Sequence, residues 1–136
     1  MESALLPVLE IFNSWKDFTA FLKHHEIGSA FPGVGIFHNK HNNTLLRSVD
    51  DTPFYRDENN MYTLFGQKGD QDLKDKYNAP FLQKGQAYLY RVKGKARKQY
   101  LYYGKVTVLA DSLEELDHPD RNGDIRKIYR VALVYK

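Results

Sequence analysis

The sequence of 136 residues contains no cysteine, and this absence removes several classes of protein at once. Disulfides, thiolate metal sites and cysteine-dependent hydrolases are all excluded. A chain without cysteine is compatible with a reducing compartment, so we expect an intracellular protein, either nuclear or cytoplasmic. No stretch approaches the length of a membrane-spanning helix, and no basic leader precedes an apolar run at the N-terminus. The sequence therefore predicts a soluble, unprocessed protein without a membrane partner.

The common catalytic and cofactor-binding motifs are also missing. Gly66 and Gly69 are not followed by the Lys-Ser/Thr pair of a phosphate-binding loop. The five histidines lack the spacing of a metal site, and no serine lies in a nucleophile elbow. We therefore predict no cofactor and no bound metal. Asp70, Asp72 and Lys74 are the one set that could hold a divalent metal, so a small metal-dependent nuclease stays an open alternative.

The composition that remains is that of a folded, β-rich domain. Hydrophobic residues make up 42% of the chain, and the ten Tyr and eight Phe supply most of an aromatic content of 14%, which favours strands. The length fits one compact domain. We expect a single α+β, mainly β domain over 1–136, with a helical N-terminal part at 1–30 and a β-barrel at 31–136.

One helix is predicted near the N-terminus. Ser14 followed by Asp17 is typical of a helix start, and Gly28 is a stop signal. Between them Trp15, Phe18 and Leu22 share a face that we interpret as core packing. The sequence predicts an amphipathic helix of about three turns that flanks the barrel.

Strands are predicted along the rest of the chain. They cover 33–37, 44–49, 61–65, 86–92, 99–108 and 125–135, and the first two form a hairpin. Gly104 predicts a bulge or bend in a long strand. The basic segment 94–98 is interpreted as a hairpin tip and the acidic segment 111–120 as a solvated loop. These elements predict a small, strongly curved, antiparallel β-barrel.

The charge distribution indicates an anionic partner. The formal net charge is +3 and the isoelectric point is about 9.0. Lysines and arginines concentrate between residues 84 and 105, whereas the following segment is acidic. A one-sided basic surface of this kind suits nucleic acid.

Five short motifs occur in a recognisable order. Gly35-Ile36 lies on an early strand, Tyr62-Thr63 precedes a glycine-rich bend, Asp70-Gln71 and Asn78-Ala79 follow, and Tyr102-Tyr103-Gly104 comes late. As a set they resemble the SRA domain, also called YDG, of the PUA-like superfamily. The run 66–70 is similar to versions associated with modification-dependent restriction endonucleases. Tyr103 departs from the family, which has Asp at this position.

The resemblance implies a reader of modified DNA. Family members fold as a curved β-barrel with flanking helices, flip a modified cytosine such as 5-methylcytosine out of the duplex, and hold it between aromatic rings. Residues for a base-binding pocket carried over from the family are Tyr55, Asp57, Tyr62 and Thr63. Asp57 would accept a hydrogen bond from the cytosine N4 amine, which thymine lacks. The implied partner is duplex DNA with a modified base.

Two further groups of residues are expected to support the pocket and to contact the DNA backbone. The residues expected to hold the loop behind the pocket are Gly66, Gln67, Gly69, Asp70, Gln71 and Asn78, because Asp and Asn bond neighbouring amides and glycine permits tight backbone conformations. The residues expected to contact phosphates are Lys40, Lys68, Arg97, Lys98 and Lys105.

Three alternatives remain beside the DNA reader. A PUA-like module that binds RNA or a modified RNA base would have similar strands and a similar basic face. A structural or protein-interaction barrel would use its tyrosines for packing alone. The nuclease is the third. At this length the sequence favours a non-catalytic module that serves a partner enzyme over a complete enzyme.

Overall fold

The computed structural model describes residues 8–30, 35–49, 61–64, 70–119 and 122–134. The described elements, in chain order, are β1 (Glu10–Phe12), α1 (Trp15–His24), β2 (Ile36–His38), β3 (Thr44–Val49), β4 (Met61–Thr63), α2 (Asn78–Lys84), β5 (Gln86–Lys93), β6 (Gln99–Pro119) and β7 (Ile125–Val134). The prediction of a mainly β fold with an N-terminal helix is confirmed.

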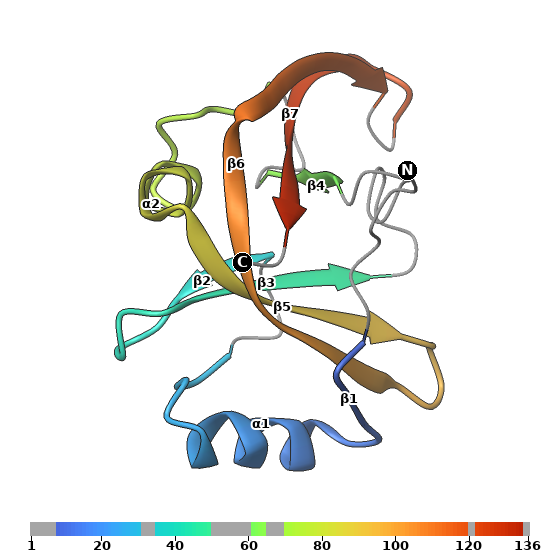
Figure 1. Ribbon diagram of the computed structural model, residues 1–136. Coiled ribbons are helices and arrows are strands. Elements are labelled where there is room, and N and C mark those ends of the chain that lie inside the picture. The colour runs from blue at the N-terminus through green and yellow to red at the C-terminus, as the bar shows by residue number, and fades with distance from the viewer. Residues whose placement is uncertain (1–7, 31–34, 50–60, 65–69, 120–121, 135–136) are drawn as a thin grey trace, which may run out of the picture.

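The strands form one sheet that curls into a half-barrel (Figure 1). Their order is β2-β3-β5-β6-β7-β4, and β1 pairs with β6 beside this path. The β2–β3 hairpin is antiparallel as predicted, but β3 and β5 run parallel. The sheet is therefore mixed, with this one parallel pair in the described part of a mostly antiparallel sheet, and the sequence analysis did not identify the parallel pair.

Helix α1 lies against the outer side of the sheet (Figure 1). Ser14 is extended, and its hydroxyl accepts a hydrogen bond at 3.0 Å from the backbone N–H of Asp17, a cap worth about 1 kcal/mol. Phe18 and Leu22 are completely buried. The helix ends at His24, before Gly28, because Glu26 already adopts a positive φ of 58°. The predicted helix and its buried face are confirmed.

Two hydrophobic cores lie on opposite sides of the sheet. The inner core fills the half-barrel and includes Ile36, Leu46, Tyr62, Phe81, Val106 and Val131. The outer core lies under α1 and includes Phe18, Leu22, Leu45, Tyr90 and Tyr102. The outer core is rich in aromatic contacts, among them Phe18 and Tyr90 with ring centroids 4.8 Å apart.

The β5–β6 pair contributes side chains to both cores and contains a bulge. The register shifts between Leu89 and Tyr90, opposite Gly104, which has φ +87°. Leu89 belongs to the inner core, whereas its neighbour Tyr90 belongs to the outer core. The interpretation of Gly104 as a bulge position is confirmed, and the extra residue lets Tyr103 and Val106, three residues apart on β6, both lie in the inner core.

The acidic segment 111–120 was predicted to be a solvated loop, and this prediction is wrong for its described residues. They belong to β6, which continues to Pro119 and pairs with β7. Glu114 lies opposite Arg130 and Asp117 lies opposite Lys127 in the register. Opposite charges on facing strands stabilise a pairing that the acidic strand would not favour by itself.

Helix α2 and strand β1 were not predicted. The segment 78–84 forms α2 although it contains Pro80, because proline is tolerated in the first helical turn, where the backbone N–H has no intrahelical partner. Gly85 ends α2 in the left-handed conformation at φ 73°. Neither described helix combines the length and the apolar character needed to cross a bilayer.

Candidate nucleic-acid interface

Strand β4 carries the two described residues of the predicted pocket, Tyr62 and Thr63, and lies at one end of the sheet order. The hydroxyl of Tyr62 is shared between the carbonyl oxygens of Gly35 at 2.9 Å and Arg47 at 3.1 Å. These acceptors belong to the β2–β3 end of the sheet. One side chain therefore ties the two ends of the half-barrel together across its interior.

The ring of Tyr62 is packed in the inner core with an exposed fraction of 2%. It contacts Phe81 edge-on, with ring centroids 6.2 Å apart. Burial raises the pKa of the Tyr62 hydroxyl far above its usual value, because the phenolate would lose its hydration there. Tyr62 is thus a neutral hydrogen-bond donor at any ordinary pH.

Thr63 is partly exposed and lies opposite Arg130 of β7. Side chains of adjacent strand residues point to opposite faces, so Thr63 and Tyr62 do not share a face of β4. Tyr55 and Asp57 lie outside the described residues. The assignment of these four residues to one pocket stays a prediction.

Gln71 joins the segment after β4 to β7 through its side-chain amide. Its Nε2 donates to the carbonyl of Leu64 at 2.8 Å, and its Oε1 accepts from the backbone N–H of Tyr129 at 2.8 Å. The side chain is 6% exposed. The amide of Gln71 therefore adds two hydrogen bonds just past the end of β4, beside the backbone bond from Leu64 N–H to the carbonyl of Tyr129 at 2.9 Å.

Asp70 and Asn78 also bind backbone groups. The carboxylate of Asp70 accepts from the N–H of Lys127 at 2.7 Å, and the fully buried Asn78 donates to the carbonyl of Asp72 at 2.9 Å. Gly66, Gln67 and Gly69 lie outside the described residues. The described members of the predicted loop scaffold thus fix the chain between β4 and α2 against β7.

The acidic residues considered for a nuclease are engaged with the backbone as well. Asp72 accepts from the N–H of Lys74 at 2.9 Å. Within the described ranges no three His, Asp or Glu side chains converge on a position that suits a metal ion.

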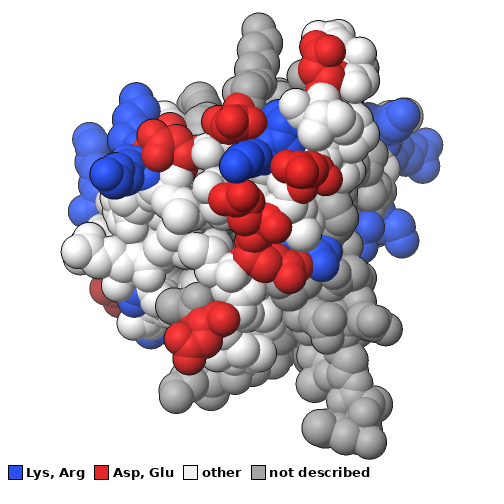
Figure 2. Space-filling model, turned by 90° about the horizontal axis from the view of Figure 1, so that it is seen from above, with Lys and Arg blue, Asp and Glu red and all other residues white. Residues whose placement is uncertain are grey.

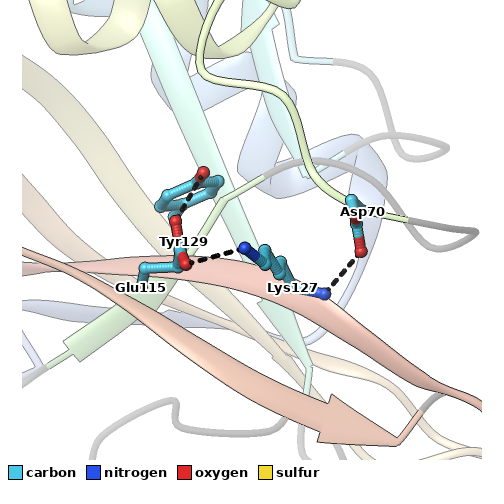
Figure 3. Close-up of polar contacts among 4 residues, drawn as sticks. All are labelled: Asp70, Glu115, Lys127 and Tyr129. Atoms are coloured by element: carbon cyan, nitrogen blue, oxygen red, sulfur yellow. Dashed lines mark hydrogen bonds and ion pairs between the residues drawn. The ribbon is translucent and has the colours of Figure 1, made fainter.

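The face over β6 and β7 is acidic, as Figure 2 shows in its middle. Glu115 pairs with Lys127 at 3.4 Å and accepts from the hydroxyl of Tyr129 at 3.0 Å (Figure 3). These hydrogen bonds to Glu115 raise the pKa of both Lys127 and Tyr129. A face with exposed Asp and Glu repels phosphates, so it is poorly suited to bind a nucleic-acid backbone.

The described basic residues of the predicted phosphate set come from separate parts of the sheet. Lys40 lies in the β2–β3 turn, Arg97 and Lys98 lie in the β5–β6 turn, and Lys105 lies on β6. All four are exposed, and none forms an ion pair with another described residue. Lys68 lies outside the described residues.

The sequence analysis missed Arg47. Its carbonyl accepts from Tyr62, and its positive charge partly opposes the rise in the pKa of Tyr62 and Tyr90. Its Nε is buried without a hydrogen-bond partner. The available signal was an arginine within the apolar strand 44–49.

No family model and no curated protein matches this sequence. Solved structures do match. The sulfur-binding and SRA domains of ScoMcrA, in complex with phosphorothioated DNA, align with 95% of this chain at a TM-score of 0.62 and 17% identity. The chain has the fold of an SRA domain. The resemblance predicted from the sequence is thereby confirmed at the level of the fold.

Two further solved structures share the SRA fold. The modification-dependent TagI restriction endonuclease aligns with 98% of this chain at a TM-score of 0.62 and 16% identity. KRYPTONITE, solved in complex with mCHH DNA, aligns with all of it at a TM-score of 0.56 and 13% identity. This chain spans 39% of the ScoMcrA chain, 51% of the TagI chain and 33% of the KRYPTONITE chain.

Proposed function

We propose that the chain is a non-catalytic DNA-binding module that recognises a modified cytosine after the base has been flipped out of the duplex. The observation that supports this proposal is the SRA fold, which neighbours solved with phosphorothioated DNA and with mCHH DNA share. Extruding a base costs a few kcal/mol of stacking, about the amount that an aromatic pocket with hydrogen bonds to the base edge returns.

The proposed pocket consists of Tyr55, Asp57, Tyr62 and Thr63. Asp57 accepts from the cytosine N4 amine, Tyr55 and Tyr62 stack on the base, and Thr63, whose side chain lies on the opposite face of β4 from Tyr62, lines the pocket with its backbone. The hydroxyl bonds to Gly35 and Arg47 hold the ring of Tyr62 in one orientation. Because that ring is 2% exposed, a base that stacks on it has to displace side chains that now cover it.

The proposed duplex contacts are electrostatic and do not read the sequence. They involve Lys40, Lys68, Arg97, Lys98 and Lys105. The acidic face over β6 and β7 disfavours the opposite docking orientation. Since the aligned neighbours are longer chains, one of them a restriction endonuclease, we further propose that this module brings a partner enzyme to modified DNA inside the cell.

The test is a comparison of binding to duplexes that differ only in one cytosine. Fluorescence anisotropy is measured with 5-methyl-, 5-hydroxymethyl- and unmodified cytosine over a series of salt concentrations. We expect tighter binding to a modified duplex, and an affinity for all duplexes that falls as salt rises. A 2-aminopurine placed beside the modified base should brighten on binding, because flipping unstacks it. Equal binding to all three duplexes would refute modified-cytosine recognition.

Asp57 provides the sharper variant. Asp57→Ala should weaken binding to the modified duplex by roughly tenfold, the value of one good hydrogen-bonded contact to a base edge. Asp124→Ala removes the same charge from an exposed turn and serves as the matched control. If single-stranded RNA competes better than the modified duplex, the module is an RNA binder instead.

A further inference from the structure

A groove lies between the residues that lead into α1 and the turn that joins β5 to β6, at the lower right of Figure 1. Its volume is about 710 Å³, within the range of about 300–1,000 Å³ typical of small-molecule sites. The lining residues are Asn13, Ser14, Trp15, Lys95, Ala96, Arg97, Lys98, Gln99 and Tyr100. In Figure 1 the segments that line the groove lie well away from β4, which carries the described residues of the proposed base pocket.

The charge of the groove is of one sign. Three of its lining residues, Lys95, Arg97 and Lys98, are cationic, and none is acidic. All three are exposed, and none pairs with a carboxylate of the described chain. An anionic ligand would therefore meet three cations without displacing an internal ion pair.

The aromatic side of the groove is formed by Trp15 and Tyr100. Both side chains are partly exposed, and their ring centroids lie 5.4 Å apart with an interplanar angle of 61°. Phe18 stacks parallel to Tyr100 at 5.8 Å and fixes its ring from the outer core. Partly exposed aromatic rings beside cations suit a ligand that carries both flat rings and phosphates.

The two sides of the groove are held at a fixed separation. Phe12 pairs with Tyr100 in the β1–β6 ladder, and Gln99 donates to the side-chain oxygen of Asn13 at 3.1 Å. The Ser14 cap holds the start of α1 beside them. The groove is therefore formed before any ligand arrives, which lowers the entropic cost of binding.

We propose that this groove binds a segment of single-stranded DNA, with a base against Trp15 and Tyr100 and its phosphates on Lys95, Arg97 and Lys98. The proposal rests on the proposed function only in taking DNA as the nucleic acid. A duplex presents phosphates but keeps its bases stacked inside, so it cannot use the aromatic side of the groove. A single strand uses both sides.

Trp15 is the only tryptophan of the chain, so its fluorescence reports on this groove alone. The full chain is titrated with a short oligothymidylate, with a blunt unmodified duplex, with thymidine monophosphate and with inorganic phosphate. We expect the oligothymidylate to quench Trp15 most strongly, the monophosphate to act only at much higher concentration, and phosphate to have no effect. If the duplex quenches as strongly as the oligothymidylate at equal phosphate concentration, the assignment to single strands is overturned.

The cationic side is tested by the variant Lys95→Ala/Arg97→Ala/Lys98→Ala. It should bind oligothymidylate roughly tenfold more weakly, and the slope of log affinity against log salt should fall by about two, since three phosphate contacts are lost. The variant Lys23→Ala/Lys74→Ala/Lys76→Ala removes the same charge from exposed positions outside the groove and should leave the affinity nearly unchanged. If both triple variants lose the same affinity for oligothymidylate, the binding depends on net charge and not on the groove, and the proposed site is refuted.

The aromatic side is tested by Trp15→Leu, with binding followed by anisotropy of a labelled oligothymidylate. The affinity should fall about tenfold, within the range measured for loss of one base-stacking ring. A folded Trp15→Leu variant that binds as tightly as the parent would refute stacking on Trp15. If this variant fails to fold, Tyr100→Leu provides the same test.

These outcomes separate the groove from the proposed function. Preference for a modified duplex without quenching by oligothymidylate would refute the groove and leave the modified-base reader standing. Quenching by oligothymidylate without any preference among the three duplexes would do the reverse.

Discussion

The substitution Tyr62→Phe tests the link that Tyr62 makes between the two ends of the half-barrel. It removes a buried hydroxyl that is shared between Gly35 and Arg47 and keeps the ring that packs in the inner core. The carbonyl of Gly35 retains the N–H of Arg47 at 2.7 Å, so it is not left without a partner. We therefore expect the free energy of unfolding to fall by about 1–3 kcal/mol, the range for a buried hydrogen bond and a partly unsatisfied acceptor.

The same substitution changes the response to alkali. Burial raises the pKa of Tyr62 in the folded state, whereas the unfolded value is about 10. The contribution of the protonated Tyr62 hydroxyl to the free energy of unfolding is therefore fully present below about pH 10. Above that pH it falls by about 1.4 kcal/mol per pH unit, because only the unfolded chain releases the proton. Phenylalanine has no such proton. The difference in the free energy of unfolding between the parent and Tyr62→Phe should therefore shrink by about 1.4 kcal/mol between about pH 10 and 11.

The assay is urea unfolding of the parent and the variant, followed by circular dichroism, at about pH 8 and about pH 11. Tyr88→Phe, which changes a partly exposed tyrosine of β5, is the control and should alter stability at neither pH by more than about 0.5 kcal/mol. If Tyr62→Phe lowers the free energy of unfolding by the same amount at both pH values, the assignment of a buried, protonated hydroxyl is contradicted.

The variant also separates structure from base recognition. Tyr62→Phe keeps the stacking ring and should bind the modified duplex nearly as well as the parent. Tyr62→Leu should lose binding if a base stacks on this ring. Retained binding by a folded Tyr62→Leu variant would show that Tyr62 only packs.

Three further substitutions test other parts of the fold. Gln71→Leu keeps the approximate shape but leaves the two backbone groups that Gln71 binds without partners, so urea unfolding should show a loss of about 2–4 kcal/mol. Gly28→Ala places a Cβ 2.4 Å from Nδ2 of Asn39 and should destabilise by clearly more than Gly85→Ala, whose Cβ meets nothing within 4 Å and costs only the left-handed strain of about 1–2 kcal/mol. A smaller loss for Gly28→Ala would contradict the packing around Asn39. Glu115→Gln should lower the pKa of Lys127, measurable by NMR titration, and change stability by less than about 0.5 kcal/mol because the pair is exposed.

Local signals in the sequence were sufficient for the elements that depend on near neighbours. The Ser14 cap predicted the start of α1, the alternation in 86–92 predicted β5, and Gly104 predicted the bulge. Each of these features is determined by a few consecutive residues, so a short segment of the sequence is enough to predict it.

Features decided by distant residues were missed. The parallel pairing of β3 with β5 brings together strands about forty residues apart. No short stretch of sequence indicates that a loop of this length closes between two particular strands. The acidic half of β6 is stable as a strand because β7 supplies Arg130 and Lys127 opposite it. The bonds from Tyr62 to Gly35 and Arg47 likewise depend on how the sheet curls.

The candidate site was predictable only in part. Tyr62 and Gln71 were identified from their motifs, but their hydrogen-bond partners were not. The groove beside Trp15 was divided in the sequence between a core helix and a hairpin tip, more than eighty residues apart. The pairing of β1 with β6, together with the contacts of Trp15 and Asn13 to β6, brings these two segments together.

The bulge at Gly104 has a consequence for how this domain tolerates changes in length. Side chains alternate along a strand, yet Tyr103 and Val106 both lie in the inner core although they are three residues apart, because Gly104 adds one residue at the bulge. Removing Gly104 would restore regular alternation, and Tyr103, Val106 and Val108 would all stay in the interior of the half-barrel. A one-residue deletion in a regular part of β6 would, by contrast, move the side chains on one side of the deletion to the opposite face of the sheet. Gly104 is therefore a position at which β6 can lose one residue without exchanging the two cores.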